Sequence, residues 1–179
     1  AEMKLITEKA KLLIGKSTYN IDLRYHKDEF EKIPWVKYSQ ISINPPDNLT
    51  VKIIEHDPLF LWNDLNYVNK EMQTFVTPNL PVKNILKLAS NDYSHIKMYQ
   101  LFQSVQSHLL DINEVILALS KQDDMLKIKS ENLTIIVRYS RYHDKIREFI
   151  SVYPDFASKL KNRKNIHIDL RYPTGFAVR

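Results

Sequence analysis

The sequence predicts an α+β protein with two domains, residues 1–57 and residues 58–179. Three observations support this prediction. Residues 1–57 contain two helical patterns followed by two alternating apolar–polar runs with a proline-rich turn between them. Residues 58–179 contain many short alternating runs with two amphipathic helical patterns among them. The chain ends in a further alternating run, Ile166 to Leu170, typical of a strand with one buried face.

The first domain is expected to be a small unit of two helices and a β-hairpin. Helices are predicted over residues 3–14 and 22–33, and Gly15 stands where a left-handed residue ends the first helix. Strands are predicted over residues 35–43 and 49–55, because apolar and polar side chains alternate there. The inward face of the first helix comprises Leu5, Ile6, Ala10, Leu13 and Ile14, and that of the second comprises Leu23, Phe30 and Ile33.

The second domain is expected to be a β-rich domain with two helices packed on its sheet. The predicted strands are residues 59–62, 67–69, 73–76, 85–88, 115–119, 125–129, 133–139 and 166–170. The predicted helices are residues 92–110 and 142–160, the second with Ile146, Phe149, Ile150, Tyr153 and Phe156 inward. Residues 79–81 break the chain, and a basic loop at 159–164 leads into the terminal strand.

The composition excludes several kinds of site. The chain has no cysteine, so disulfides and thiolate chemistry are absent. Its two glycines, Gly15 and Gly175, lie far apart, which excludes glycine-rich phosphate loops. A formal net charge of +5 is mildly basic and suits an anionic partner or an ordinary basic extracellular domain. No apolar run of about 18 residues occurs, so the chain as given is expected to be soluble, or a fragment cut from an anchor.

The end of the chain carries the functional prediction. A terminal strand pairs on one side only unless another strand closes over it, so its free edge can accept a partner segment. Residues 172–175 form a turn, and Phe176 and Val178 then point to one face of the last strand. Arg171 and Tyr172 are residue types enriched at interface hot spots. The residues alone leave open that Tyr172 and Phe176 instead pack into the core.

Several motifs point to one known family. In order they are Ile33-Pro-Trp-Val36, Pro46-Asp-Asn-Leu49, Leu61-Trp-Asn63, Gln73-Thr-Phe75 and Phe149-Ile-Ser-Val-Tyr-Pro154. The most specific is Asp169-Leu-Arg-Tyr-Pro-Thr-Gly-Phe-Ala-Val178. Together they resemble the FtsQ/DivIB bacterial cell-division proteins, whose ending is Asp-Leu-Arg-Tyr-x-x-Gly-x-Ala-Val. Two features depart from the family: the first POTRA strand, expected before residue 3, is missing or cut short, and no membrane anchor is present.

The resemblance implies a non-enzymatic scaffold without a cofactor or metal. The chain would be the periplasmic part of a single-pass inner-membrane protein at the division site, with its anchor N-terminal to residue 1. A POTRA domain would contact other division proteins, and a β-domain would bind extracytoplasmic segments of FtsB and FtsL, helping to regulate septal peptidoglycan synthesis. By motif position, the partner-binding residues would be Arg171, Tyr172, Thr174, Gly175, Phe176, Ala177 and Val178.

Three other functions fit the sequence less well. The candidate catalytic groups are adjacent His–Asp pairs. Neighbouring residues on a strand point to opposite faces, so such a pair cannot form a shared catalytic site by itself. Nucleic-acid binding would use the basic and aromatic residues 138–143, but an ordinary solvated strand end explains them and no nucleic acid is expected. A POTRA module of outer-membrane protein assembly or polypeptide transport is the nearer alternative. The Asp-Leu-Arg-Tyr ending favours the division family.

One pentapeptide, Ile-Asp-Leu-Arg-Tyr, occurs twice, at residues 21–25 and 168–172. The first copy runs into a helix-like segment, whereas the second runs into Pro173-Thr-Gly175. A structural repeat is therefore not expected.

Overall fold

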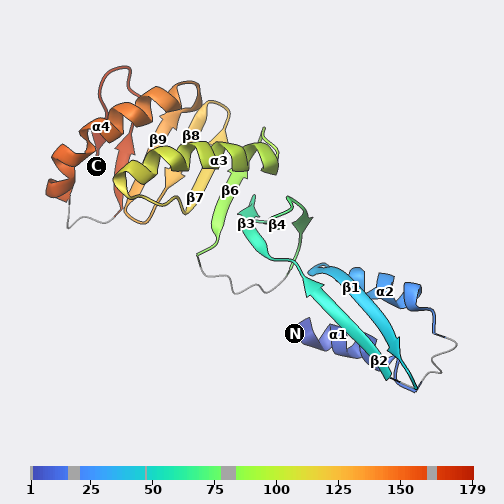
Figure 1. Cartoon of the computed structure of the whole chain (residues 1–179). Coiled ribbons are helices and arrows are strands. Elements are labelled where there is room, and N and C mark those ends of the chain that lie inside the picture. Colours follow the sequence, from blue (N-terminus) through green and yellow to red (C-terminus); the bar gives the residue numbers. More distant parts are fainter. Residues whose placement is uncertain (1, 16–20, 47, 78–83, 161–164) are drawn as a thin grey trace. The chain divides into compact units, whose positions relative to one another are not determined.

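The structure is a computed structural model that describes residues 2–15, 21–46, 48–77, 84–160 and 165–179 (Figure 1). The predicted break at 79–81, the predicted inward side chain of Phe156 and the basic segment 161–164 lie outside the described residues. The chain forms two compact units, one of Ala1–Asp57 with Phe75–Asn79 and one of Pro58–Thr74 with Leu80–Arg179. The predicted α+β class is confirmed, and the division into functional domains after residue 57 stays a prediction.

The first unit is built from α1 (Glu2–Lys11), α2 (Leu23–Glu31), β1 (Val36–Asn44) and β2 (Asn48–Glu55). The two strands form the predicted antiparallel hairpin. Helix α2 begins where the Asp22 carboxylate accepts a hydrogen bond from the backbone N–H of Tyr25 at 2.9 Å, an ordinary N-cap. The core of this unit consists of Leu13, Phe30, Ile33, Trp35 and Val36.

The first helix is shorter than predicted, and the prediction that Leu5 and Ile14 point inward is wrong. The helix ends at Lys11, and the next backbone bonds are tighter, from Leu13 to Ala10 and from Ile14 to Lys11. Because the helical period is lost there, Leu13 is buried while Ile14 stays 78% exposed. Leu5, the residue immediately before the inward Ile6, is also exposed.

One mixed sheet has the strand order β11-β10-β9-β8-β7-β6-β3-β4-β5, and all of it except Phe75 of β5 belongs to the second unit. Its strands are β3 (Pro58–Trp62), β4 (Asn66–Asn69), β5 (Thr74–Phe75), β6 (Leu86–Ser90), β7 (Ala118–Gln122), β8 (Met125–Lys129), β9 (Leu133–Arg138), β10 (Ile166–Asp169) and β11 (Ala177–Val178). Strands β3 and β6, β6 and β7, and β9 and β10 pair in parallel; β3–β4, β7–β8, β8–β9 and β10–β11 are antiparallel.

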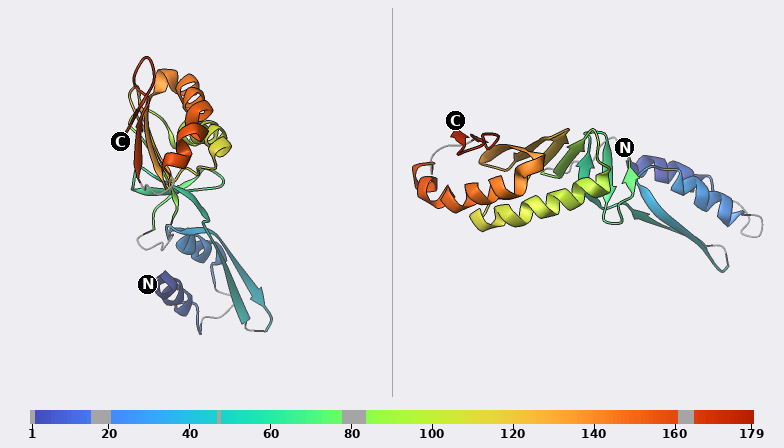
Figure 2. Two further views of the ribbon diagram at one scale, coloured as in Figure 1. Left: turned by 90° about the vertical axis from the view of Figure 1, so that its left-hand side faces the viewer. Right: turned by 90° about the horizontal axis from the view of Figure 1, so that it is seen from above.

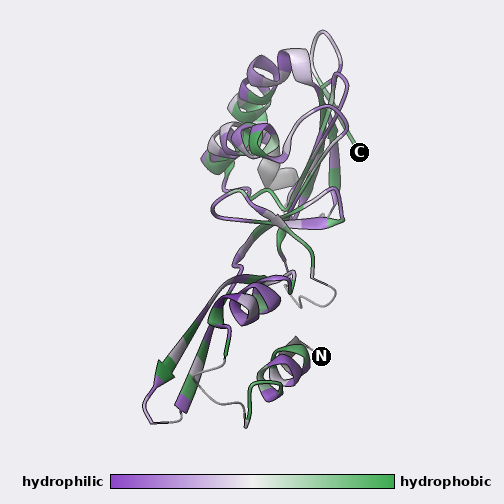
Figure 3. Ribbon diagram, turned by 90° about the vertical axis from the view of Figure 1, so that its right-hand side faces the viewer, coloured by the Kyte–Doolittle hydropathy of each residue, from purple (hydrophilic) through white to green (hydrophobic). Residues whose placement is uncertain are grey.

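Helices α3 (His95–Leu109) and α4 (Tyr142–Leu160) lie on the same face of this sheet (Figure 2). Both carry hydrophilic and hydrophobic stretches, as amphipathic helices do (Figure 3). Their apolar faces meet alternate strand residues in one core, which includes Leu88, Met98, Leu119, Ile135, Ile146 and Phe149. The prediction of two helices packed on a sheet is therefore confirmed.

Strand β7 begins three residues later than predicted, at Ala118 instead of Val115. The Gln106 side chain of α3 explains the shift. Its amide donates to the Glu114 carbonyl at 2.9 Å, and its oxygen accepts from the Ile116 N–H at 2.8 Å. These bonds occupy the backbone groups that a strand would need, so pairing with β8 begins only with Leu117 N–H to Lys129 O, at 2.8 Å.

Candidate partner-binding edge

The last two strands form an edge of the sheet in the second unit. Strand β10 pairs in parallel with β9, and β11 folds back antiparallel onto β10. The pairing extends past β11, because His167 and Arg179 exchange both backbone hydrogen bonds at 2.9 Å. No described strand pairs with the outer side of β11.

The register of this pairing decides which backbone groups face outward. In an antiparallel pair, hydrogen-bonded and non-hydrogen-bonded residue pairs alternate. His167 and Arg179 form a hydrogen-bonded pair, so the next pair, Ile168 and Val178, is a non-hydrogen-bonded one. The N–H and C=O of Val178 therefore point away from β10, toward the outer edge.

The turn before β11 is fixed by backbone geometry and by α4. Gly175 has a φ of +70°, in the left-handed region that other residues enter only with strain. Two residues earlier, the buried Lys145 ammonium of α4 donates to the Pro173 carbonyl at 3.0 Å. The same ammonium bonds the Glu148 carboxylate at 2.7 Å, so its charge is paired. The turn is thus held against the helix.

Arg171 is held in place by a two-point contact with Asp169. Its Nε and Nη2 atoms donate to the two carboxylate oxygens at 2.8 and 2.5 Å, and its backbone N–H donates to Oδ1 at 3.1 Å. The guanidinium hydrogen bonds lower the pKa of the Asp169 carboxyl from its usual value. The Arg171 side chain is 45% exposed, so it remains accessible to an anion.

The predicted site residues separate into two groups. Tyr172 is 47% exposed, and Thr174 and Gly175 lie exposed in the same turn. Phe176 is half-buried and packs edge-on against Phe149 of α4, with ring centroids 5.7 Å apart. Phe176 therefore faces the helices, as the core alternative in the sequence proposed.

The two faces of the terminal strand differ as the alternation predicts. Ala177 and Arg179 line a hollow of about 170 Å³ together with His167, Asp169 and Arg171. Val178 is 40% exposed. A partner at this edge would meet polar and charged side chains next to the outward backbone groups of the strand.

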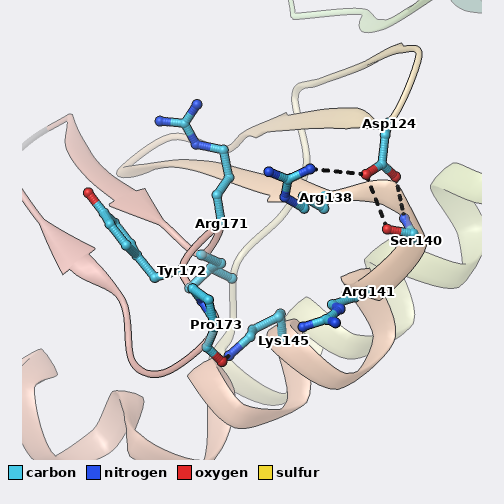
Figure 4. A pocket seen from close by; sticks show the side chains of 9 residues that line it. Asp124, Arg138, Ser140, Arg141, Lys145, Arg171, Tyr172 and Pro173 are labelled. Carbon is cyan, nitrogen blue, oxygen red and sulfur yellow. Dashed lines mark hydrogen bonds and ion pairs between the residues drawn. The ribbon is translucent and has the colours of Figure 1, made fainter.

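A basic recess of about 390 Å³ adjoins the turn (Figure 4). Side chains from three segments line it, namely Asp124 after β7, the run Arg138 to Lys145, and Leu170 to Pro173. Its charged residues are Arg138, Arg141, Lys145, Arg171 and Asp124. Positive charge therefore predominates.

Among the described residues that line the recess, Asp124 is the one carboxylate, and it already accepts hydrogen bonds from Ser140. Asp124 accepts from the Ser140 N–H at 2.8 Å and from its hydroxyl at 3.1 Å, and lies 3.6 Å from Arg138. The Ser140 backbone hydrogen bond is the main cause of the lowered pKa of Asp124. The Arg141 side chain forms no ion pair or hydrogen bond with any described residue. The recess can therefore bind an added carboxylate.

The sequence prediction missed Arg138, Arg141 and Lys145 as part of this site. It noted residues 138–143 only as basic and aromatic. The signal that identifies them is the parallel pairing of β9 with β10, because parallel strands end at the same edge of a sheet. Arg138 ends β9 and Asp169 ends β10, so the segments that follow them are neighbours.

The chain was also compared with known proteins. No family model matches it. It is 26% identical over 168 residues to the Cell division protein FtsQ of Haemophilus influenzae, covering 91% of this chain and 65% of that protein. It is 24% identical over 189 residues to FtsQ of Bordetella pertussis, covering 92% and 67%. FtsQ of Shewanella oneidensis is 26% identical over 170 residues, covering 93% and 64%.

The chain is similar to the FtsQ cell-division proteins over about nine tenths of its length. It spans about two thirds of the length of these FtsQ proteins. The FtsQ resemblance inferred from the motifs is thus confirmed, and the partner-binding role of residues 171–178 stays a prediction. Within the described residues, no helix has both the length and the apolar character needed to cross a bilayer.

Proposed function

We propose that this chain is an FtsQ-like, non-enzymatic scaffold of bacterial cell division that binds extracytoplasmic segments of FtsB and FtsL. It would act outside the cytoplasmic membrane at the division site and help to regulate septal peptidoglycan synthesis. The similarity to FtsQ proteins supports a role in cell division. The placement of the binding site is supported by one observation: the outer side of β11 has no described strand paired with it and lies next to the exposed Tyr172 and the basic recess.

Binding begins with β-augmentation at the edge. A partner segment adds as a strand beside β11 and pairs with the outward N–H and C=O of Val178. Main-chain hydrogen bonds supply affinity there, and neighbouring side chains select the partner. Because β11 is short, the edge alone offers few such bonds.

The recess then supplies specificity. A carboxylate on the partner binds Arg171 and the unpaired Arg141, which share the recess. Tyr172 lines the same recess and offers a large exposed ring at its rim. The positive charge also raises the encounter rate with an acidic partner.

Titration of the whole chain with a purified extracytoplasmic FtsB–FtsL segment tests the proposal. Tyr172→Ala should weaken binding by about 1–3 kcal/mol, a hot-spot magnitude, without changing the circular dichroism spectrum. The matched control is Tyr25→Ala, since Tyr25 is also an exposed tyrosine but lies on α2. Equal affinities for all three proteins, or equal losses in both variants, would show that the edge is not the binding site.

A further inference from the structure

A second surface of the second unit lies on the side of the sheet that α3 and α4 leave uncovered (Figure 2). Side chains alternate along each strand, so the residues between the buried ones point to this side. In the middle of the sheet these are Lys87 and Ala89 of β6, Ala118 and Ser120 of β7, and Lys127 and Lys129 of β8.

The strand register arranges these side chains as a trough. Lys87 lies opposite Ala118, and Ala118 lies opposite Lys129. In the next row, Ala89 lies opposite Ser120, and Ser120 lies opposite Lys127. The small side chains of Ala118 and Ser120 thus form a floor with Lys87 on the β6 side and Lys127 and Lys129 on the β8 side, and the resulting hollow measures about 220 Å³.

The charge of the trough is mostly unpaired. The side chains of Lys127 and Lys129 are exposed and form no ion pair or hydrogen bond with any described residue. Asp64 also lines the hollow and lies 3.6 Å from Lys87, and both side chains are mostly exposed. Such exposed pairs contribute little, so the ammonium of Lys87 remains available to another carboxylate.

We propose that this trough binds an extended, acidic polypeptide segment of a partner protein. The lysines of β6 and β8 flank β7 at two strand spacings, about 9.6 Å apart. That width suits one extended chain, whereas a helix with its side chains is about 10–12 Å wide. Glutamate or aspartate side chains on alternate sides of the segment would reach the lysines on both flanks.

Other occupants fit the trough less well. Proteins that bind single-stranded nucleic acids stack bases on aromatic side chains, and none of the described residues that line this hollow is aromatic. A second copy docked by two-fold symmetry would set the trough against an identical surface, lysine against lysine. The site is also separate from the β11 edge and the basic recess, with which it shares no lining residue.

Fluorescence anisotropy with a labelled octaglutamate peptide and the full chain tests the proposal. Lys127→Gln/Lys129→Gln should bind the peptide about tenfold more weakly than the unchanged chain, because two exposed ion pairs are lost. Added salt should weaken the binding of the unchanged chain and narrow this difference. Both positions are exposed on a strand, so circular dichroism should show an unchanged fold.

The matched control is Lys11→Gln/Lys52→Gln, which removes the same charge from exposed positions of the first unit. Retained binding in the control, with loss in the trough variant, supports the site. Equal losses in both variants would overturn it, since the peptide would then sense only net charge. No loss in either variant would also overturn it, because the peptide would then bind elsewhere. Tighter binding of an oligothymidine probe than of octaglutamate would also overturn it.

Discussion

The Lys145 ammonium of α4 donates a hydrogen bond to the carbonyl oxygen of Pro173, 28 residues further along the chain. The donor is buried, and the acceptor lies in the exposed turn that carries Tyr172. One side chain of the helix thus positions the turn of the candidate binding edge.

Replacement of Lys145 by methionine should therefore affect both stability and binding. The methionine side chain has a similar length, but the Pro173 carbonyl loses its donor. We expect a loss of about 1–2 kcal/mol in the free energy of unfolding, measured by urea titration, and weaker binding of the FtsB–FtsL segment. Arg147→Met, at an exposed position of the same helix, should change stability by less than about 0.5 kcal/mol. Equal effects of both variants would contradict the anchoring role.

Phe176 and Tyr172 should respond differently to truncation. Phe176 packs on Phe149, so Phe176→Ala should lower the free energy of unfolding by about 1–3 kcal/mol. Tyr172 is exposed, so Tyr172→Ala should change it by less than about 0.5 kcal/mol. Thermal or urea unfolding separates the two. A large stability loss in Tyr172→Ala would mean that its ring is part of the core.

Val178→Pro should block the edge while preserving the strand. Proline removes the N–H of Val178, which points outward, and is tolerated on edge strands. The bonds between His167 and Arg179 remain. We expect the FtsB–FtsL segment to bind at least about tenfold more weakly, at an unchanged circular dichroism spectrum. Unchanged affinity would show that the partner does not add as a strand here.

The Asp169–Arg171 contact predicts an acid dependence of stability. The folded-state pKa of Asp169 lies below its unfolded value of about 3.9, so the ionised carboxylate stabilises the fold above that pH. This contribution is lost as the pH falls through the lowered folded-state pKa. Arg171→Leu should raise the pKa of Asp169, which carboxyl NMR titration measures. An unchanged pKa in this variant would show that the guanidinium is not its cause.

Glu29 predicts a similar dependence in the first unit. Hydrogen bonds from Lys32 and then Lys9 lower the pKa of Glu29 to about 2. The ionised carboxylate stabilises the unit above its ordinary pKa of 4.5, and this contribution is lost as the pH falls toward about 2. Because Lys9 lies on α1 and Glu29 on α2, Lys9→Gln should raise this pKa and increase amide hydrogen exchange in α1. Slower or unchanged exchange would contradict the prediction.

Local patterns in the sequence predicted most elements correctly. Strand β8 and helix α4 were predicted with their observed bounds, and β9 was predicted to within one residue. Strict alternation and amphipathic periodicity depend only on which face is buried, so they are readable from the chain itself. The left-handed positions of Gly15 and Gly175 were also predictable, because glycine tolerates positive φ.

Errors arose where a distant side chain determines the backbone. Val115 and Leu117 look like inward strand residues but are exposed, whereas the polar Lys121 points inward. The ammonium of Lys121 is stabilised there by Asp92 and by the rings of Tyr93 and Tyr139. No local pattern contains this contact. The basic recess was missed for the same reason, since its segments meet only through the pairing of β9 with β10.

The repeated pentapeptide shows most directly the difference between what local sequence determines and what distant contacts determine. At residues 21–25 its aspartate caps a helix by accepting from the Tyr25 N–H. At residues 168–172 the same five residues end a strand, and the aspartate binds Arg171. The sequence by itself determined the α+β class and the positions of most helices and strands, because these depend on local periodicity. Only the tertiary structure decided the conformation of this pentapeptide and the composition of the binding edge, because both depend on which distant strand or helix pairs with them.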